Sequence, residues 1–180
     1  KNQFEGQSIS PLLAESYGEA AARLAQKIKV TDEKTFVEAF GKRAFRRPLS
    51  PAEKARYQAL LAKAGPQAAA EAMLQSPSFL YRPETATRPE DRPYVRASRL
   101  SYLLWDTMPD EALMTAAAKG ELNIAEGFEK HARRMLADPK ARRFATEFFG
   151  QWLGFYRFDE YRGVDNARFP EFTDDVKSAM

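Results

Sequence analysis

The stretch Ser50-Pro51-Ala52-Glu53 is the clearest local signal in the chain and predicts the start of an α-helix. A serine hydroxyl at this position accepts a hydrogen bond from the backbone of the third helical residue, and a glutamate there bonds back to the serine backbone. Proline is favoured at the first helical position because its nitrogen needs no hydrogen bond there. We therefore expect a helix from residue 51 to Gly65-Pro66, a pair that ends one helix and begins another.

The same kind of helix punctuation recurs on both sides of this segment. Prolines, capping residues and glycines separate stretches whose apolar residues repeat at helical spacing, and strand-like alternation is almost absent. Further helix starts are expected at Ser10-Pro11, Thr31, Tyr94, Pro109-Asp110-Glu111, Asn123-Ile124-Ala125-Glu126 and Asp138-Pro139. The segment 76–83 is expected to form a turn with anchoring aromatic residues. The pattern predicts an all-α fold of two small packed helical domains, with about eight or nine helices.

Apolar stripes indicate which side chains should face the cores. The expected inward groups are Leu100, Leu103 and Leu104; Phe128, Met135 and Leu136; and Phe144, Ala145, Phe148, Phe149, Trp152 and Leu153. The stretch from Arg82 to Pro93 is rich in proline and charge and lacks this periodicity, which is typical of a linker. We therefore place a small helical domain at 31–82, a linker at 83–93 and a second helical domain at 94–180, with a first helix inside 1–30. Both ends of the chain are interpreted as cuts through a longer polypeptide.

Composition excludes several classes of chemistry. The 180 residues contain no cysteine and one histidine, which rules out disulfides, thiolate metal sites, a cysteine nucleophile and a Cys-x-x-Cys-His haem attachment within the chain. The 28 basic and 25 acidic residues are interspersed, so the net charge of +3 is not that of a dedicated nucleic-acid binder. No apolar run approaches the roughly 20 residues of a membrane span. The composition is that of a globular protein.

A basic run at residues 42–47 is the first candidate for a binding surface. Arg43, Arg46 and Arg47 surround Phe45 and could grip phosphate or an acidic partner. The run also ends a predicted helix, where cations complement the negative end of the helix dipole and could pair with acids elsewhere in the domain. We favour this structural interpretation.

Arg99 and Asp106 pose a similar choice. They flank the apolar residues 100–105, and they could form a buried polar network or bind a ligand. The aromatic strip from Trp152 to Tyr161, which includes Tyr156, could serve as a docking surface. His131 lies in a helix rich in cations, so we interpret it as a surface residue of a cationic face rather than as a general base.

A calcium site was also considered for the acidic residues near the C-terminus. These residues could supply oxygen ligands, but they lack the spacing of a calcium loop, and solvated turns and helix starts are the simpler explanation. They are Asp159, Glu160, Asp165, Asp174 and Asp175. We therefore assign no metal site and no catalytic residue.

Several of these motifs together resemble a known series of domains. Residues 42–50 (Lys-Arg-Ala-Phe-Arg-Arg-Pro-Leu-Ser) followed by Glu53, and residues 76–82 (Ser-Pro-Ser-Phe-Leu-Tyr-Arg), are similar to the two signatures of a small planctomycete-type domain of unknown function. Residues 99–113, 120–122, 134–139 and 151–153 resemble the domain that follows it in the same proteins. Residues 2–4, 10–13 and 17–21 are similar to the tail of the preceding domain, which would then occupy 1–30.

The resemblance implies a cellular setting but no established reaction. Proteins of this series are large and exported, carry c-type cytochrome modules, and occur in planctomycetes, verrucomicrobia and myxobacteria. It therefore implies a periplasmic or cell-surface location, with c-type haem in neighbouring modules and no cofactor within this chain. The implied partners are other domains of the same polypeptide and a redox partner or polymeric substrate, without nucleic acid.

Two classes of function follow, with a weaker third. In the first, the chain is a helical scaffold and docking region that supports electron transfer or redox chemistry. In the second, it forms part of the active site of an oxidative enzyme, with Arg99, Asp106 and aromatic residues lining a cleft. The third is a helical nucleic-acid-binding module that uses Arg43, Arg46 and Arg47. We favour the first because the sequence contains many packing signals and no self-contained catalytic group.

Overall fold

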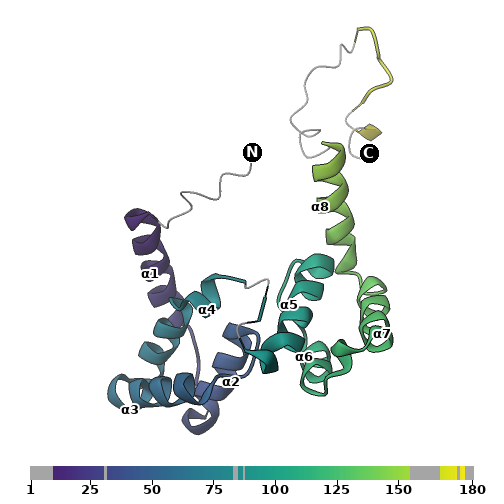
Figure 1. Cartoon of the computed structure of the whole chain (residues 1–180). Helices are drawn as coiled ribbons and strands as arrows, with labels where there is room; N and C mark the ends of the chain where they lie inside the picture. Colours follow the sequence, from purple (N-terminus) through teal and green to yellow (C-terminus); the bar gives the residue numbers. More distant parts are fainter. Residues whose placement is uncertain are drawn as a thin grey trace.

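A computed structural model describes residues 10–30, 32–82, 85–86, 88–154, 167–173 and 175–176 of the chain (Figure 1). Within these ranges the fold contains eight α-helices, two short 3-10 helices and no strand, which confirms the predicted all-α class. The elements are α1 (Pro11–Gln26), α2 (Glu33–Phe45), α3 (Pro51–Leu74), α4 (Pro77–Leu80), η1 (Pro89–Asp91), α5 (Arg92–Trp105), α6 (Glu111–Ala118), η2 (Glu121–Asn123), α7 (Ala125–Leu136) and α8 (Ala141–Leu153).

Local chemistry explains most of the helix boundaries. Ser50 Oγ accepts a hydrogen bond from Glu53 N at 3.2 Å, and Glu53 Oε2 accepts one from Ser50 N at 2.8 Å, so the predicted capping box is present. Ser10 caps α1 in the same way, through the backbone N of Leu13. Gly65 has φ 82° and ψ 174°, outside the helical region, and divides α3 into two helical pieces as its Gly-Pro pair predicts.

Three predicted boundaries were wrong or shifted. Helix α2 is capped by Asp32, whose carboxylate accepts from Lys34 N at 3.0 Å; Thr31 lies outside the described residues. Helix α7 begins after Ile124 without a side-chain cap, because Asn123 is part of η2 and its amide oxygen accepts from Arg96 instead. Helix α8 begins at Ala141, because Asp138 and Pro139 form a separate turn in which Asp138 accepts from Lys140 N.

The segments on either side of the predicted linker also differ from expectation. The predicted turn at 76–83 contains the four-residue helix α4, capped by Ser76. At the other end of the linker, Pro89–Asp91 forms η1 and α5 already begins at Arg92. Pro93 is compatible with this start because the first helical turn needs no hydrogen bond from a proline nitrogen.

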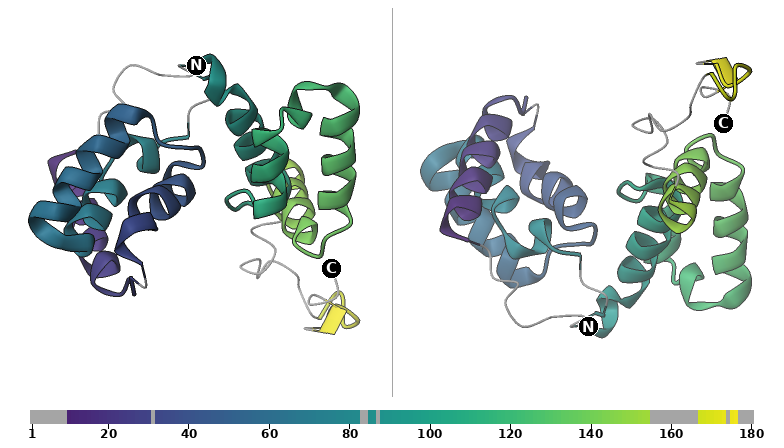
Figure 2. Two further views of the ribbon diagram at one scale, coloured as in Figure 1. Left: turned by 90° about the horizontal axis from the view of Figure 1, so that it is seen from below. Right: turned by 90° about the horizontal axis from the view of Figure 1, so that it is seen from above.

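The helices form two groups, each with its own core, and the two views of Figure 2 show them side by side. In the N-terminal unit, α1 to α4, helices α1 and α2 pack on α3. Its buried cluster comprises Ala25, Phe36, Val37, Ala44, Phe45, Tyr57, Ala69, Ala70 and Met73. In the C-terminal unit, η1 to α8, helix α5 is central and contacts α6, α7 and α8. Its buried cluster comprises Ala97, Leu100, Leu104, Trp105, Leu113, Ala116, Ala117, Leu122 and Met135.

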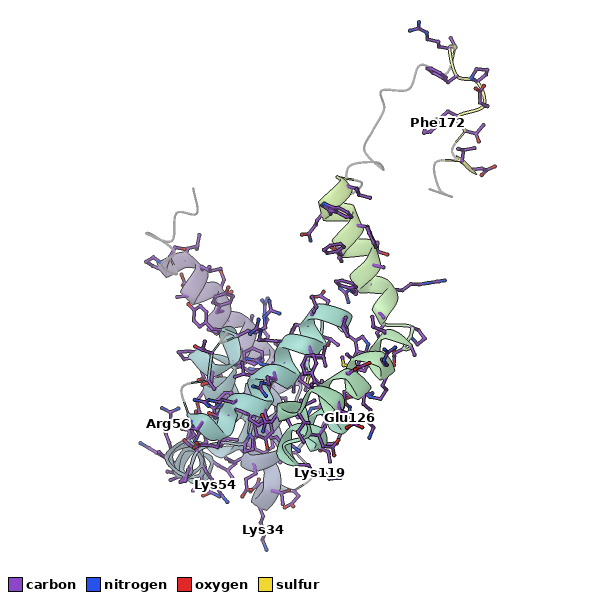
Figure 3. The ribbon with its side chains drawn as sticks, turned by 45° about the vertical axis from the view of Figure 1, so that its right-hand side comes forward. Lys34, Lys54, Arg56, Lys119, Glu126 and Phe172 are labelled. Carbon is purple, nitrogen blue, oxygen red and sulfur yellow. The ribbon has the colours of Figure 1, made fainter. Side chains whose placement is uncertain are left out.

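Several side chains expected to face inward are exposed. Met135, Leu100 and Leu104 are buried, but Leu103, Phe128 and Leu136 are not. The larger difference is in α8, where Phe148, Phe149, Trp152 and Leu153 are all exposed. Only the first part of this helix reaches the core, through Phe144, and Figures 1 and 3 show the rest of α8 extending beyond the other helices. The apolar stripe of α8 therefore extends beyond the part of the helix that packs on the core of the C-terminal unit.

His131 is the opposite case, because it is buried rather than on the surface. Its side chain is 7% exposed, and its Nε2 lies 3.2 Å from Glu121 Oε2. This hydrogen bond lowers the pKa of the Glu121 carboxyl. The expectation of a surface residue failed because His131 lies one helical turn before Met135 and shares its inward face. Within the described residues, no helix combines the length and the apolar character needed to cross a bilayer.

Candidate functional site

Arg46 is a buried structural cation at the end of α2. It adopts a left-handed backbone conformation, with φ 57°, and its side chain turns back into the N-terminal unit with the residue 6% exposed. The guanidinium donates hydrogen bonds to the carbonyl oxygens of Ser78 at 2.8 Å, Phe79 at 3.3 Å and Tyr81 at 2.9 Å. Burial lowers the pKa of this guanidinium below its ordinary value. Arg46 therefore ties α4 and the residues after it to α2.

Arg47 connects the two helical units through carboxylates. Its guanidinium forms a two-fold hydrogen bond with the Glu53 carboxylate, at 2.8 Å for each nitrogen–oxygen pair. Its Nε lies 3.7 Å from Asp91 of η1, and Asp91 in turn accepts two 2.8 Å bonds from Arg88. The bond from Arg47 lowers the pKa of Glu53 to about 2, and it raises the pKa of Arg47. This arginine–carboxylate cluster links α2 and α3 to the start of the C-terminal unit.

Two more contacts cross the same junction. Lys42 Nζ of α2 lies 2.9 Å from Glu111 of α6 in an exposed ion pair. Arg82, which follows α4, places its guanidinium carbon 4.3 Å from the ring centroid of Tyr102 of α5. Both contacts are charged or cation–π interactions rather than apolar packing. The two cores are therefore joined through their charged surfaces.

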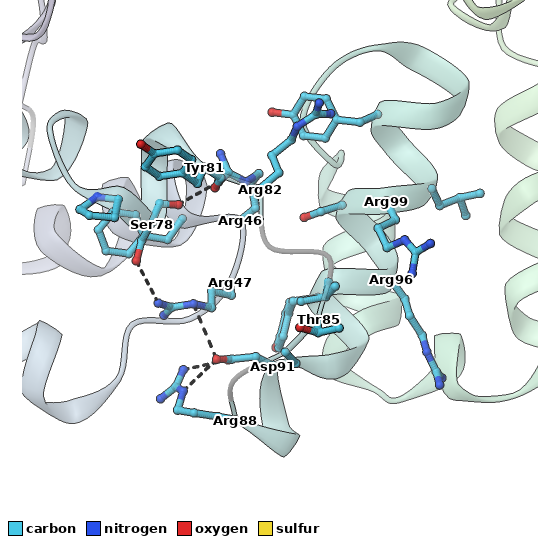
Figure 4. Close-up of a pocket in the computed structure, with 18 of the residues that line it drawn as sticks. Arg46, Arg47, Ser78, Tyr81, Arg82, Thr85, Arg88, Asp91, Arg96 and Arg99 are labelled. Atoms are coloured by element: carbon cyan, nitrogen blue, oxygen red, sulfur yellow. Dashed lines mark hydrogen bonds and ion pairs between the residues drawn. The ribbon is translucent and has the colours of Figure 1, made fainter. Parts of the chain in front are cut away.

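These residues surround an open groove of about 1100 Å³ between the two units (Figure 4). Among the described residues that line it are Arg46, Arg47, Arg82, Arg88, Arg96 and Arg99, together with the carboxylates of Glu53 and Asp91. Among the described lining residues, six arginines against two carboxylates leave an excess of four positive charges. Tyr81, Tyr94, Tyr102, Leu103 and Phe128 also contribute to the lining. We call this the arginine groove.

The walls of the arginine groove are held by polar contacts. Arg96 of α5 donates to the Leu122 carbonyl oxygen at 3.1 Å and to the Asn123 amide oxygen at 2.9 Å. The Arg82 guanidinium lies over the ring of Tyr102, with its carbon 4.3 Å from the ring centroid. Arg99, from the same helix as Arg96, is exposed and lines the groove. The arrangement presents fixed cations to an anion, and the described lining residues include no side chains paired as nucleophile and base.

The predicted site residues divide into three groups. Arg46, Arg47 and Arg99 line the groove; Arg47 pairs with the acid Glu53, whereas Arg46 bonds backbone carbonyl oxygens rather than an acid. Arg43 is exposed on α2 outside the groove. A buried network of Arg99 and Asp106 was wrong, because both side chains are exposed and Asp106 lies 3.4 Å from Arg143 of α8.

The aromatic candidates lie elsewhere. Trp152 is 69% exposed on α8 and does not line the groove, while Tyr156 lies outside the described residues. The calcium candidates fall outside them as well, except for Asp175, which is exposed. No cluster of three or more potential metal-ligating residues occurs in the described ranges.

Sequence analysis missed Arg82, Arg88, Arg96 and Asp91. Arg88 and Asp91 lie in the predicted linker at 83–93, and Arg82 directly precedes it. The sequence does contain a signal for ordered arginines. Arg47, Arg82 and Arg88 each precede a proline, and a following proline restricts the backbone of the arginine to extended conformations. Alternation of arginine with acidic residues in a short linker is also a pattern from which mutual pairing can be expected.

Two family models match the chain. Residues 32–84 match PSD5, a protein of unknown function (DUF1595), and residues 92–180 match PSD4, a protein of unknown function (DUF1592). No curated protein and no solved structure gives a significant match. The boundary between the two matches falls at the junction that the arginine groove occupies. The chain therefore carries two consecutive domains of unknown function, one of the PSD5 type followed by one of the PSD4 type.

Proposed function

We propose that this chain is a helical scaffold and docking region of a larger exported protein with c-type cytochrome modules, where it supports electron transfer or redox chemistry. The observation that carries the proposal is the use of charge at the junction. Glu53, Asp91, Arg46, Arg47 and Arg88 are engaged in holding helices together. What remains at the groove is a cationic surface suited to binding rather than to acid–base catalysis.

The cytochrome setting rests on the order of the two domain types, which matches the series that the sequence motifs resemble. A chain without cysteine cannot attach a c-type haem, so the haem of the proposed parent protein belongs to other modules. In this proposal the parent protein is periplasmic or on the cell surface, and these helices position its modules relative to one another.

The exposed face of α8 supplies a second docking surface for this scaffold. Phe148, Phe149 and Trp152 form one aromatic cluster, with ring centroids 5.3 to 6.1 Å apart, and Leu153 is exposed beside them. Contiguous apolar side chains of this kind mark interaction sites on soluble proteins. We assign this face to contact with another module of the same polypeptide.

The proposal is tested on the full-length parent protein. Its reduced spectrum, measured after purification from an exported fraction, is expected to show the absorbance bands of c-type haem, while the isolated 180-residue chain is expected to be helical and colourless. Deletion of the residues corresponding to this chain should lower electron transfer to an external acceptor and leave the haem content unchanged. A parent protein without haem, or one whose electron transfer is unaffected by the deletion, would contradict the proposal.

The alternative that the groove is part of an oxidative active site has one observation in its favour. A volume of about 1100 Å³ is at the upper end of the range of small-molecule sites. This alternative predicts that Arg99→Ala abolishes turnover by the parent protein without changing its thermal midpoint. A scaffold predicts no such selective loss.

A further inference from the structure

We propose that the arginine groove binds an acidic peptide segment in which carboxylate and apolar side chains are interspersed. This inference rests on the proposed docking function and names the chemistry of the partner. The segment would come from another module of the parent protein. The charge of the groove, its apolar lining and the fixed positions of its arginines each favour such a segment.

The charge of the groove is only partly neutralised from within. Arg47 and Arg88 are matched by the carboxylates of Glu53 and Asp91. Among the described residues, the contacts of Arg46, Arg82 and Arg96 are to neutral groups, namely backbone carbonyls, the Tyr102 ring and the Asn123 amide. A carboxylate entering the groove would therefore meet the exposed guanidiniums of Arg82 and Arg96, whose charge no described acid balances, whereas Arg46 is buried and acts on the groove only through its charge. Arginine suits this role because its planar fork bonds both oxygens of a carboxylate.

The apolar part of the lining favours a peptide over other polyanions. Leu103 is 59% exposed, Tyr81 52% and Phe128 37%, and all three line the groove beside the arginines. Aliphatic and aromatic side chains of a peptide can cover these groups while its carboxylates reach the guanidiniums. An acidic glycan has no aliphatic side chain to cover Leu103. The mixture of lining residues thus matches a chain that alternates acidic and apolar side chains.

The arginines at the walls are already held in position. Arg82 is stacked on Tyr102, and Arg96 is bonded to Leu122 and Asn123, so both lose little conformational freedom when a ligand binds. Exposed lysines would lose more, and their point charges would not select the geometry of a carboxylate. The pre-set positions support specific recognition rather than general attraction of anions.

The test measures binding of fluorescein-labelled peptides to the 180-residue chain by anisotropy. The probe is a twelve-residue peptide of alternating glutamate and leucine. Two comparison peptides have the same length, one with serine in place of leucine and one with lysine in place of glutamate. The third comparison probe is a polygalacturonate oligomer. Saturable binding is expected for the glutamate–leucine peptide, weaker binding for the serine version, and none for the lysine version.

Variants locate the site. Arg82→Ala and Arg96→Ala are each expected to weaken binding about tenfold, the usual effect of losing a hydrogen bond to a charged group. Leu103→Ser should weaken binding of the leucine peptide and leave that of the serine peptide unchanged. Arg43→Ala, a change of the same charge outside the groove, is the matched control and should bind as the wild type does. Arg96→Lys keeps the positive charge but loses the planar guanidinium, so it should also weaken binding. Circular dichroism melting is measured for every variant, and an arginine-to-alanine variant with an altered midpoint is replaced by the arginine-to-lysine variant at the same position.

Three results would overturn the inference: no saturable binding of the glutamate–leucine peptide, equal weakening by Arg43→Ala and Arg82→Ala, or tighter binding of polygalacturonate than of the peptide. The last result would assign the groove to an acidic glycan. The haem spectrum of the parent protein is independent of all three, so failure of peptide recognition and failure of the scaffold proposal can be told apart.

Discussion

The basic run at residues 42–47 and the aromatic face of α8 show the reverse of the burial that hydropathy predicts: a cation is buried and aromatic side chains are exposed. Arg46, at the end of the basic run, is 6% exposed, whereas Trp152, the largest apolar side chain of α8, is 69% exposed. Hydropathy sets the cost of exposure, but burial also requires a partner surface of the right chemistry at the right place. The end of α2 has such a partner in the carbonyl oxygens after α4, and the described residues place none over the end of α8.

The largest expected effect concerns the buried cation. Arg46→Ala removes bonds to three carbonyl oxygens and leaves them in a partly buried setting, so we expect a loss of about 3 kcal/mol in the free energy of unfolding. Urea unfolding followed by circular dichroism measures it. The control is Arg43→Ala. Arg43 is exposed and lies on α2 three residues before Arg46, so its loss should change the free energy of unfolding by less than about 0.5 kcal/mol. Equal effects of the two variants would show that Arg46 is not a structural cation.

A second prediction concerns the carboxylate that pairs with Arg47. Because the pKa of Glu53 is held near 2, below its ordinary value of 4.5, the pair stabilises the folded state fully above about pH 4.5. This contribution is lost as pH falls from 4.5 towards 2, where the folded protein takes up the proton. Glu53→Gln should lower stability at pH 7 by about 2 kcal/mol and flatten the stability profile in that acidic window.

The control for this profile is Glu129→Gln, which removes an exposed partner of Arg133 on α7. Its stability at pH 7 should stay within about 0.5 kcal/mol of the wild type, because exposed pairs contribute little. If Glu53→Gln retained the slope of the wild type between pH 2 and 4.5, another group would be responsible for the acid sensitivity.

The third prediction compares two phenylalanines on α8. Phe144 packs against the core of the C-terminal unit, and Phe149 is 45% exposed. We expect Phe144→Ala to cost about 2 kcal/mol, from the loss of buried apolar area, and Phe149→Ala to cost less than about 0.5 kcal/mol. Phe149→Ala should nevertheless reduce binding of a hydrophobic dye or retention on a phenyl column. A large loss of stability from Phe149→Ala would mean that this face is covered in solution.

The smallest expected effect concerns backbone strain. Arg46 and Asp106 both end their helices with positive φ, at 57° and 49°. Glycine adopts this conformation without steric cost, so Asp106→Gly is expected to raise stability by about 0.5 kcal/mol. Arg46→Gly should lower stability instead, because the same relief of strain comes with the loss of the carbonyl bonds. Thermal melts of the two variants check the signs, and a stabilised Arg46→Gly would refute the role given to its side chain.

Sequence reasoning succeeded where the decisive interactions are local. Ser10, Ser50 and Gly65 act through their own backbone neighbours, so their residue types were sufficient to predict helix boundaries.

It failed where a distant residue decides. Asn123 was predicted to cap α7, but it bonds Arg96, 27 residues away in the sequence. The burial of Arg46 likewise depends on carbonyls more than 30 residues away. None of these could be obtained from local patterns, because the patterns do not specify which surfaces meet. The groove combines residues from both units, and for the same reason only Arg46, Arg47 and Arg99 of its arginines were singled out.

The charged junction makes the relative position of the two units sensitive to the surrounding medium. Lys42 and Glu111 meet in solvent, whereas the contact between Arg47 and Asp91 is more sheltered. Dissolved ions screen charges over about 8 Å at 0.15 M salt and about 3 Å at 1 M, so the exposed pair weakens first as salt rises. We therefore expect the two units to separate on one side while they stay joined on the other, and the width of the groove between them to increase with ionic strength.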